Sequence, residues 1–403
     1  MSGASPRPPV DRLVIVSNGH GEDVIGAAIA RALRSLAPRL DVRALPLVDD
    51  GAPYRVQDVP LLMQGLRMPS GGVTLHSFTD LVADLRAGFL GLTTRQAVRL
   101  ARLSCDVLLV VGDVYAQALA ALARPRLRAV LQPLVSIRHW SPRPQLNRYF
   151  MERISYPERV LMRHLAAVVY ARDEATAAWL RRNGVRQALA LGNPVVDVIA
   201  GRPLVGLPPG PVVALLPGTR AHTPAALTRM AAALTRMPGV TGLVAWHGGT
   251  LPDLPGWAPV PERPVVTGLT RVLASGDSRL WIVQGRFSDV LASARVALGT
   301  AGTGNEQAAA SGLPVVSFPL EPHYARAFVA NQERLLGAGL TVTDGSPEAI
   351  AASAQRLLAD GPERRRAVRD GMDRMGPAGG AERIARDLLA RAGRLAAGPD
   401  ARA

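Results

Sequence analysis

Short runs of Val, Leu and Ile recur along the chain, and each is followed by a turn and a longer Ala/Leu/Arg stretch with helical spacing. This alternation is typical of repeated βα units, which build a parallel sheet covered by helices. Ligands of such sheets bind beyond the carboxyl ends of the strands, so we expect a site in the loops that follow strands. Strands are predicted at residues 12–17, 41–47, 106–112, 128–134 and 166–171, and then at 211–218, 241–246, 279–285, 295–300 and 313–318.

Glycine and proline accumulate at residues 190–211, between the two series of strands. A length of 403 residues fits two domains at about 100 to 200 residues each. We therefore predict two α/β domains with parallel, Rossmann-like sheets that face a cleft. They are expected at residues 11–203 and 204–392, with a disordered N-terminus at 1–10 and a flexible tail at 393–403.

All 47 basic residues are arginine, and they exceed the 32 acidic residues to give a formal net charge of +15. A GC-rich genome explains the total, whereas binding of phosphates, anionic lipids or nucleic acid is the functional alternative. The single cysteine, Cys105, excludes a disulfide framework and a cysteine-based zinc site. No apolar run has the length of a signal-peptide core or a spanning helix, so a cytoplasmic protein is expected.

The first predicted strand runs directly into SNGHGED, residues 17–23. Gly19 and Gly21 permit a tight turn with positive φ, and free amides at the start of the next helix suit oxygen-rich ligands. The spacing matches neither the dinucleotide fingerprint GxGxxG nor a lysine-containing phosphate loop. His20 stands between the two glycines, and we interpret it as a base or substrate-binding group rather than as an incidental surface residue.

The most informative segment is GTAGTGNEQAAASGLPVVSFP, residues 299–319. Gly302, Thr303 and Gly304 belong to a loop of small side chains whose amides and hydroxyls suit a pyrophosphate at the start of a helix predicted at 304–311. Glu306 on that helix either accepts hydrogen bonds from ribose hydroxyls or simply complements the helix dipole.

A further loop, LLPGTRAH at residues 215–222, also follows a predicted strand. Gly218 allows the turn, and Arg220 either meets a phosphate or is one of many surface arginines. Two such loops in one domain favour a phosphorylated ligand.

Three motifs resemble those of bacterial lipid-A-disaccharide synthases. LLPGTR resembles their LLPGSR, GNPVVD (192–197) is similar to their GHPLVD, and GTAGTGNEQAAASGLPVV resembles their SGTATLEAALLGVPMVV. The chain thus resembles the glycosyltransferase B (GT-B) superfamily, specifically lipid-A-disaccharide synthase-related proteins. SNGHGED departs from the synthase's AGEASGD and looks more like the GGTGGH loop of the lipid II N-acetylglucosaminyltransferase, so the identity of the acceptor stays open.

The resemblance implies a UDP-sugar donor, of the N-acetylglucosamine type, bound mainly by the second domain. It also implies a lipid-linked or saccharide acceptor in the first domain, inverting transfer, and neither a metal nor a cofactor. The implied donor-binding residues are Gly218, Arg220, Arg286, Phe287, Gly302, Thr303, Gly304, Glu306, Asn331 and Gln332. The implied acceptor-side loop holds Asn18, Gly19, Gly21 and Glu22, and the candidates for the catalytic base are His20 and Asp113. The chain has no Asp-X-Asp pair, the usual ligand of metal-dependent transferases.

Arginines and aromatic residues interleave in the segment 136–164. Arg138, Trp140, Arg143 and Arg148 suit an anionic membrane surface or a phosphorylated lipid, and a solvated helical face is an equal alternative. Nucleic acid is not expected, because no nucleic-acid-binding motif accompanies the segment. Apolar residues at helical spacing in 81–103 are better explained by core packing.

The sequence therefore predicts a cytoplasmic, membrane-associated, UDP-sugar-dependent glycosyltransferase. A UDP-N-acetylglucosamine 2-epimerase-like enzyme, which needs no acceptor, is one alternative. A non-catalytic protein that binds nucleotide sugars or lipids is the other.

Overall fold

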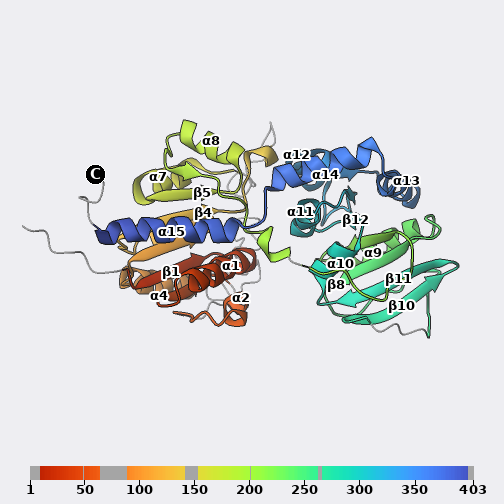
Figure 1. Cartoon of the computed structure of the whole chain (residues 1–403), viewed down its shortest axis with the longest axis horizontal. Helices are drawn as coiled ribbons and strands as arrows, with labels where there is room; N and C mark the ends of the chain where they lie inside the picture. Colours follow the sequence, from red (N-terminus) through yellow and green to blue (C-terminus); the bar gives the residue numbers. More distant parts are fainter. Residues whose placement is uncertain are drawn as a thin grey trace, which may run out of the picture. The chain divides into compact units, whose positions relative to one another are not determined.

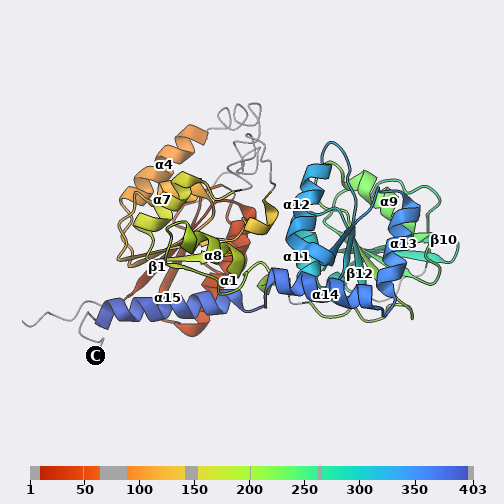
Figure 2. The same cartoon turned by 90° about the horizontal axis from the view of Figure 1, so that it is seen from above.

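The computed structural model describes residues 10–48, 50–63, 89–140, 153–199, 201–261 and 266–397. They form two compact units, each with its own sheet (Figure 1; Figure 2). Unit 1 contains the described residues up to Val198 and again from Ala378, and unit 2 is Ile199–Pro377.

The sheet of unit 1 is parallel, and its described strands follow the order β2-β1-β3-β4-β5-β6. They are β1 (Arg12–Ser17), β2 (Asp41–Pro46), β3 (Val107–Val111), β4 (Leu127–Gln132), β5 (Val168–Ala171) and β6 (Ala188–Leu189). Because β1 lies beside β3, and β3 beside β4, the loops at their carboxyl ends are neighbours.

Helices cover both faces of this sheet (Figure 2). They are α1 (His20–Leu36), α2 (Ala52–Val56), α4 (Phe89–Ala101), α5 (Val114–Ala120), α7 (Tyr156–Leu165), α8 (Glu174–Arg182) and α15 (Gly380–Ala397). Leu13 and Ile15 of β1 pack into the core that α1 and α15 share, whereas Val14 and Val16 pack into the core on the opposite face. Burial on both faces explains why the strands are almost continuously apolar.

The last helix, α15, returns to unit 1 and packs against α1, with Ile384 and Leu388 in the shared core. The carboxylate of Asp197 accepts hydrogen bonds from the backbone N–H groups of Gly379, Gly380 and Ala381, at the start of this helix. This differs from the predicted domain at 204–392, which assigned the last helix to the second half. It also differs from the predicted flexible tail, because α15 is helical up to Ala397. The spacing of apolar residues in 380–397 shows that this helix is amphipathic. It does not show which of the two sheets its apolar face packs against.

Asp197→Ala is expected to lower the free energy of unfolding of unit 1 by about 1 to 2 kcal/mol, because it removes the acceptor for the first N–H groups of α15. Urea denaturation followed by circular dichroism measures the loss. Asp197→Asn keeps one acceptor oxygen and should lose less. Equal stability of the alanine variant and the wild type would show that this carboxylate does not anchor the helix.

The sheet of unit 2 has the order β14-β13-β12-β7-β8-β11-β10-β9 among the described residues. Its strands are β7 (Val212–Leu216), β8 (Thr241–Trp246), β9 (Ala258–Pro259), β10 (Leu269–Ser275), β11 (Ser278–Gln284), β12 (Val296–Gly299), β13 (Val315–Ser317) and β14 (Leu340–Val342). All predicted strands are present, and β10 and β9 add an antiparallel edge that the sequence did not predict. Two residues of β10 are exposed and polar, so the strand lacks the continuous apolar run that identifies a buried strand.

The helices of unit 2 are α9 (Thr223–Leu234), α10 (Phe287–Ser293), α11 (Gly302–Ala310), α12 (Arg326–Leu336), α13 (Pro347–Leu358) and α14 (Pro362–Met375). Its core joins Leu215, Leu298 and Phe318 from the sheet segments to Leu227 and Ile350 from the helices. No helix in the described ranges combines the length and apolar character needed to cross a bilayer.

Candidate functional site

Two loops at the carboxyl edge of the unit 2 sheet are tied together. Thr300 follows β12, and its backbone N–H donates to Leu216 O at 3.0 Å while its hydroxyl donates to Pro217 O at 3.1 Å. Gly218 has φ = +87°, and a Cβ there would lie 3.5 Å from Thr300 O. Gly218 thus makes the turn with a positive φ, and the loops at 217–222 and 300–301 form one surface.

The helix α11 begins at this surface. Its first residue is Gly302, two residues before the predicted start, and the N-cap residue Ala301 offers no side-chain acceptor. A Cβ at Gly302 would lie 3.1 Å from the Phe328 ring, and one at Gly304 would lie 3.0 Å from the Ala301 Cβ. Both positions are tight, so glycine keeps the backbone close to its neighbours. The uncapped N–H groups and the helix dipole make this turn suited to an anion.

A buried polar network lies beneath the loop. Asn305 has no exposed surface, and its Nδ2 donates to Gly299 O (3.3 Å), the Tyr324 hydroxyl (3.1 Å) and Gln332 Oε1 (3.0 Å). Gln332 Nε2 in turn donates to Gly302 O at 2.7 Å, and the Tyr324 hydroxyl donates to Gln332 Oε1 at 2.8 Å. The network therefore holds both the end of β12 and the first turn of α11 in place.

This network changes one predicted role. Gln332 is 2% exposed, and both of its polar atoms bond to the chain, so it supports the loop rather than meeting a sugar as predicted. Asn331, beside it on α12, is also buried and hydrogen-bonds Arg334. The sequence did not identify Asn305, because a polar residue in a helix after a glycine loop is as often solvent-facing, or Tyr324, because it lies in the loop before α12.

His222 closes the loop after β7. It is 6% exposed, its Nε2 lies 2.9 Å from Thr300 O, and its ring packs on Tyr324 with centroids 5.3 Å apart. Because a carbonyl oxygen only accepts, Nε2 carries the proton. Burial lowers the pKa of His222, and the positive charge of Arg220 acts in the same direction. The imidazole is therefore held neutral beside an exposed arginine.

The remaining predicted donor residues lie around the same surface or beside it. Arg220 and Thr303 are exposed, and Glu306 is half-buried on α11. The Phe287 ring lies 3.6 Å from the position of a Cβ at Gly304, so Phe287 is brought to the first turn of α11. Arg286 pairs with Asp289 and packs across Gly268.

Unit 1 brings the loops after β1 and β3 together at the carboxyl edge of its sheet. Asn18 Nδ2 donates to Asp113 Oδ1 at 3.0 Å, and a Cβ at Gly112 would lie 3.0 Å from Asn18 Cβ. Asp113 is the N-cap of α5 and accepts from the backbone N–H of Tyr115 at 3.0 Å. His20 is the exposed first residue of α1. The predicted positive φ at Gly19 and Gly21 is wrong: Gly19 is extended, at φ = −171°, and Gly21 lies inside α1.

Three carboxyl groups at this edge have raised pKa values. Burial raises the pKa of Glu22 to about 7, and the nearby Asp113 adds to the rise. Burial also raises the pKa of Asp113. Glu158 on α7, which the sequence did not single out, is raised to about 8 for the same reason. Glu22 and Glu158 therefore have pKa values near neutral pH, which suits general acid–base chemistry.

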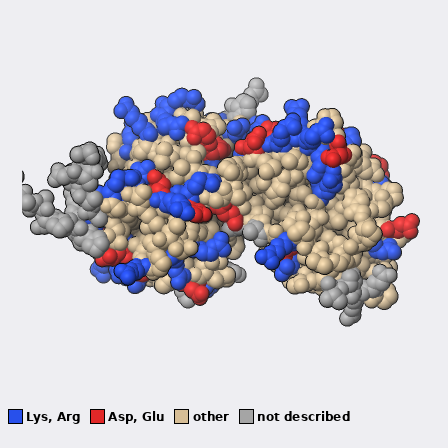
Figure 3. All heavy atoms as spheres, in the orientation of Figure 1, with Lys and Arg blue, Asp and Glu red and all other residues tan. Residues whose placement is uncertain are grey.

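Described residues of the arginine–aromatic segment stack on Trp140 and on Trp179 of α8. The Trp140 and Trp179 rings meet edge to face with centroids 4.6 Å apart, Arg153 lies over Trp140 at 5.0 Å, and Arg159 lies over Trp179 at 5.1 Å. Cation–π packing therefore explains the interleaving in part. Arg138 is exposed, and Figure 3 shows further arginines over α7 and α8. Arg143 and Arg148 lie outside the described residues.

The segment 81–103, where apolar residues recur at helical spacing, contains α4. This helix buries Leu92 and Leu100 in the core of unit 1. Core packing is therefore confirmed for that part of 81–103, and residues 81–88 lie outside the described ranges.

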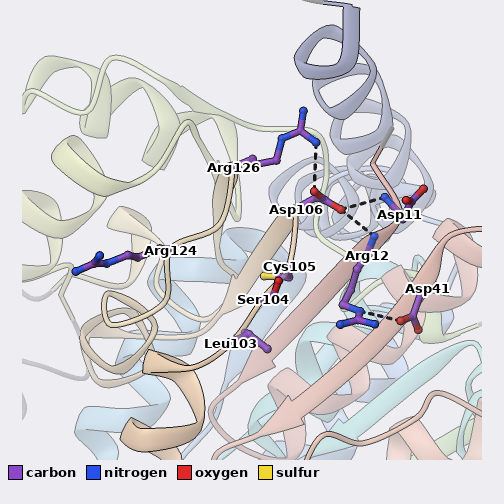
Figure 4. Close-up of a pocket in the computed structure, with 9 residues that line it drawn as sticks. All are labelled: Asp11, Arg12, Asp41, Leu103, Ser104, Cys105, Asp106, Arg124 and Arg126. Carbon is purple, nitrogen blue, oxygen red and sulfur yellow. Dashed lines mark hydrogen bonds and ion pairs between the residues drawn. The ribbon is translucent and has the colours of Figure 1, made fainter. Parts of the chain in front are cut away.

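A hollow of about 540 Å³ lies at the opposite, amino-terminal edge of the unit 1 sheet (Figure 4). Four of its charged side chains form two ion pairs, Arg12 with Asp41 at 2.9 Å and Arg126 with Asp106 at 3.2 Å. Asp106 also accepts from the backbone N–H groups of Asp11 and Arg12. These pairs join the strand starts, and the hollow lies away from the loops that follow strands.

No protein-family model matches the chain, and no curated protein matches it. Solved structures do match. The calicheamicin glycosyltransferase CalG4 has a TM-score of 0.58 at 18% identity, covering 96% of this chain and 100% of that one. MurG of Acinetobacter baumannii has a TM-score of 0.56 at 14% identity, with 94% and 99% covered. UDP-GlcNAc 2-epimerase of Methanocaldococcus jannaschii has a TM-score of 0.57 at 15% identity, with 94% and 99% covered. The chain thus has the predicted GT-B fold, with two mainly parallel α/β units.

Proposed function

We propose that this protein is a glycosyltransferase that moves a sugar from a UDP-sugar to a hydroxyl of a lipid-linked or saccharide acceptor. The observation that carries the proposal is the surface at the carboxyl edge of unit 2. There the uncapped start of α11, the Gly218 turn and the exposed Arg220 follow two adjacent strands. N–H groups and a guanidinium suit the diphosphate of a nucleotide sugar.

Each donor residue has a defined part in the proposal. The backbone from Gly302 to Gly304 and the side chain of Arg220 bind the diphosphate. Glu306 accepts hydrogen bonds from the ribose, and the segment at Arg286 and Phe287 meets the uracil. Arg220 and the positive end of α11 neutralise the leaving UDP without a metal ion, and the protein uses no other cofactor.

Unit 1 supplies the acceptor side in this proposal. The acceptor oxygen attacks the anomeric carbon, the bond from that carbon to the diphosphate oxygen breaks, and UDP leaves with the bonding electrons. The acceptor proton passes to a base, for which Asp113 and His20 are the candidates. One displacement on the opposite face inverts the anomeric configuration.

The arginines over α7 and α8, with the exposed Tyr156 and Leu165, support peripheral binding to an anionic membrane on the cytoplasmic side. Such a position would bring unit 1 to a lipid-linked acceptor. The proposal thus places the reaction in glycolipid synthesis for the cell envelope.

An epimerase-like reaction is the alternative that the carboxyl groups near Asp113 also suit. Incubation with UDP-sugars, with and without lipid extracts, separates the possibilities by mass spectrometry. Free UDP with a glycosylated lipid supports transfer, whereas a changed UDP-sugar without acceptor supports epimerisation. Binding without turnover identifies a non-catalytic protein. In the first case, His20→Ala and Asp113→Ala should keep UDP binding, and the loss of turnover identifies the base.

Glu306→Ala is expected to weaken UDP binding by about 1.5 to 3 kcal/mol, because a charged acceptor for the ribose hydroxyls is lost. Titration calorimetry with UDP measures the change. Glu348→Ala, also in unit 2 but in an exposed pair with Arg236, is the matched control and should bind UDP as the wild type does. Unaltered binding by the Glu306 variant would remove its ribose-binding role.

A further inference from the structure

Glu158 is a deeply buried carboxyl group near Asp113. It belongs to α7, is 1% exposed, and its backbone N–H donates to the Ser155 hydroxyl that caps the helix. Its side chain turns toward the carboxyl ends of β3 and β4. There its Oε1 accepts from Gln132 Nε2 at 2.6 Å and from Gln117 Nε2 at 3.0 Å. Both donors are neutral amides, and no ion pair to Glu158 occurs among the placed residues.

Gln117 also contacts the turn that carries Asp113. Gln117 Nε2 also donates to Gly112 O, at 3.2 Å, and Gly112 immediately precedes Asp113. Glu158 therefore holds Gln117, and Gln117 holds the carbonyl next to the candidate base. Three elements, β4, α5 and α7, contribute one side chain each to this arrangement.

One atom in the arrangement lacks a donor. Gln117 Oε1 is buried and has no hydrogen-bond partner within the part of the chain that the structure describes. A carboxylate has no hydrogen to give it, whereas a protonated carboxyl has one. A neutral Glu158, whose Oε1 already accepts from Gln117 Nε2, has a hydrogen that it can offer to Gln117 Oε1.

We propose that Glu158 is a positioning residue that stays protonated at neutral pH and, through Gln117, fixes the Gly112–Asp113 turn. The charged group that acts on it is Asp113, the N-cap of α5, while α5 and β4 otherwise face it with the neutral Gln117 and Gln132. Because Glu158 is neutral, Asp113 is not opposed by a second negative charge. The role of Glu158 in positioning Asp113 as a base rests on the proposed function, whereas the protonation state of Glu158 does not.

Proton linkage gives a test that needs no substrate. The pKa of Glu158 is about 8 in the folded chain, above the ordinary glutamate value of 4.5, so the folded chain binds this proton more tightly than the unfolded chain does. The stabilisation is complete below pH 4.5 and is lost as the pH rises through 8. Burial also raises the pKa of Glu22, but only to about 7, so the interval between pH 7 and 8 mainly reports Glu158. There the unfolding equilibrium constant should rise about fivefold from this group alone.

Glu158→Gln is the decisive variant, because its carboxamide keeps the acceptor, offers an N–H to Gln117 and does not titrate. It should fold as stably as the wild type below pH 4.5 and more stably than the wild type at pH 7, because the wild type alone must take up a proton on folding there. In urea denaturation between pH 7 and 8, its unfolding equilibrium constant should lack the rise of about fivefold that Glu158 causes. Glu22→Gln, the matched control, should retain that rise. A rise unchanged in Glu158→Gln would overturn the proposal, and so would a loss of stability at pH 7 as large as that of Glu158→Ala.

Carbon-13 NMR titration of the Asp113 carboxyl tests the positioning. Glu158→Ala should shift the midpoint of this titration, and Glu158→Gln should restore the wild-type value. A midpoint that is the same in all three proteins would overturn the positioning role. If linkage and titration behave as expected but no transfer is found with any acceptor, the proposed function fails while the assignment of Glu158 stands.

Discussion

Asn305→Ala is expected to lower the free energy of unfolding of unit 2 by about 2 to 4 kcal/mol. Asn305 is fully buried and donates to Gly299 O, the Tyr324 hydroxyl and Gln332 Oε1. Alanine leaves these acceptors with one donor fewer and opens a cavity between the end of β12 and α12. The variant should also bind UDP more weakly, because Gln332 then holds the Gly302 carbonyl less firmly. Scanning calorimetry measures the first effect, and titration calorimetry measures the second.

Gln307→Ala is the matched control, because Gln307 lies on the same helix and is half-buried. It should change stability by less than about 0.5 kcal/mol. Asn305→Asp keeps the shape but replaces the donor by an acceptor that faces Gly299 O and Gln332 Oε1, which have no hydrogen to donate, so it should be at least as damaging as alanine. If both Asn305 variants unfolded like the wild type, the network would not support the loop.

Strands buried on both faces were predictable from the sequence, because a run such as VLLVV in β3 has few other interpretations. The two-residue strands β6 and β9 were not, since so short a run carries no periodicity. The return of α15 to unit 1 also could not be predicted. It depends on Ile384 and Leu388 fitting the core beside α1 and on Asp197 binding the helix start.

The candidate sites also contain features that the sequence could predict and features that it could not. The loop at 299–304 could be predicted, because its glycines and hydroxyl side chains are close together in the chain and a tight turn depends on local sequence. The groups that support the two loops come from separate elements: Tyr324 and Gln332 in unit 2, and Gln117, Gln132 and Glu158 in unit 1. The sequence held partial signals for two of them, since Gln132 lies near the end of the strand predicted at 128–134 and Ser155-x-x-Glu158 has the pattern of a helix cap. Neither pattern shows that the side chains converge, because strand order decides that.

Arg220→Glu is expected to weaken UDP binding by about 100-fold or more. The loss of a charge-assisted hydrogen bond to phosphate costs about 1.5 to 3 kcal/mol, and the new carboxylate repels the diphosphate as well. Arg220 is exposed, and no ion pair to it occurs among the placed residues, so the stability of unit 2 should hardly change. The reversal should also raise the pKa of His222, because the positive charge that helps to lower it is gone.

The matched control is Arg236→Glu, which changes the net charge of unit 2 by the same amount at an arginine paired with Glu348. If the general positive potential attracts UDP, both variants should weaken binding equally, and both losses should shrink as salt rises from 50 to 200 mM. If Arg220 contacts the diphosphate directly, only its reversal should have a large effect, and most of that effect should survive at the higher salt concentration. Equal losses of UDP affinity in the two variants would show that Arg220 does not contact the diphosphate. The start of α11 would then remain as the proposed diphosphate site.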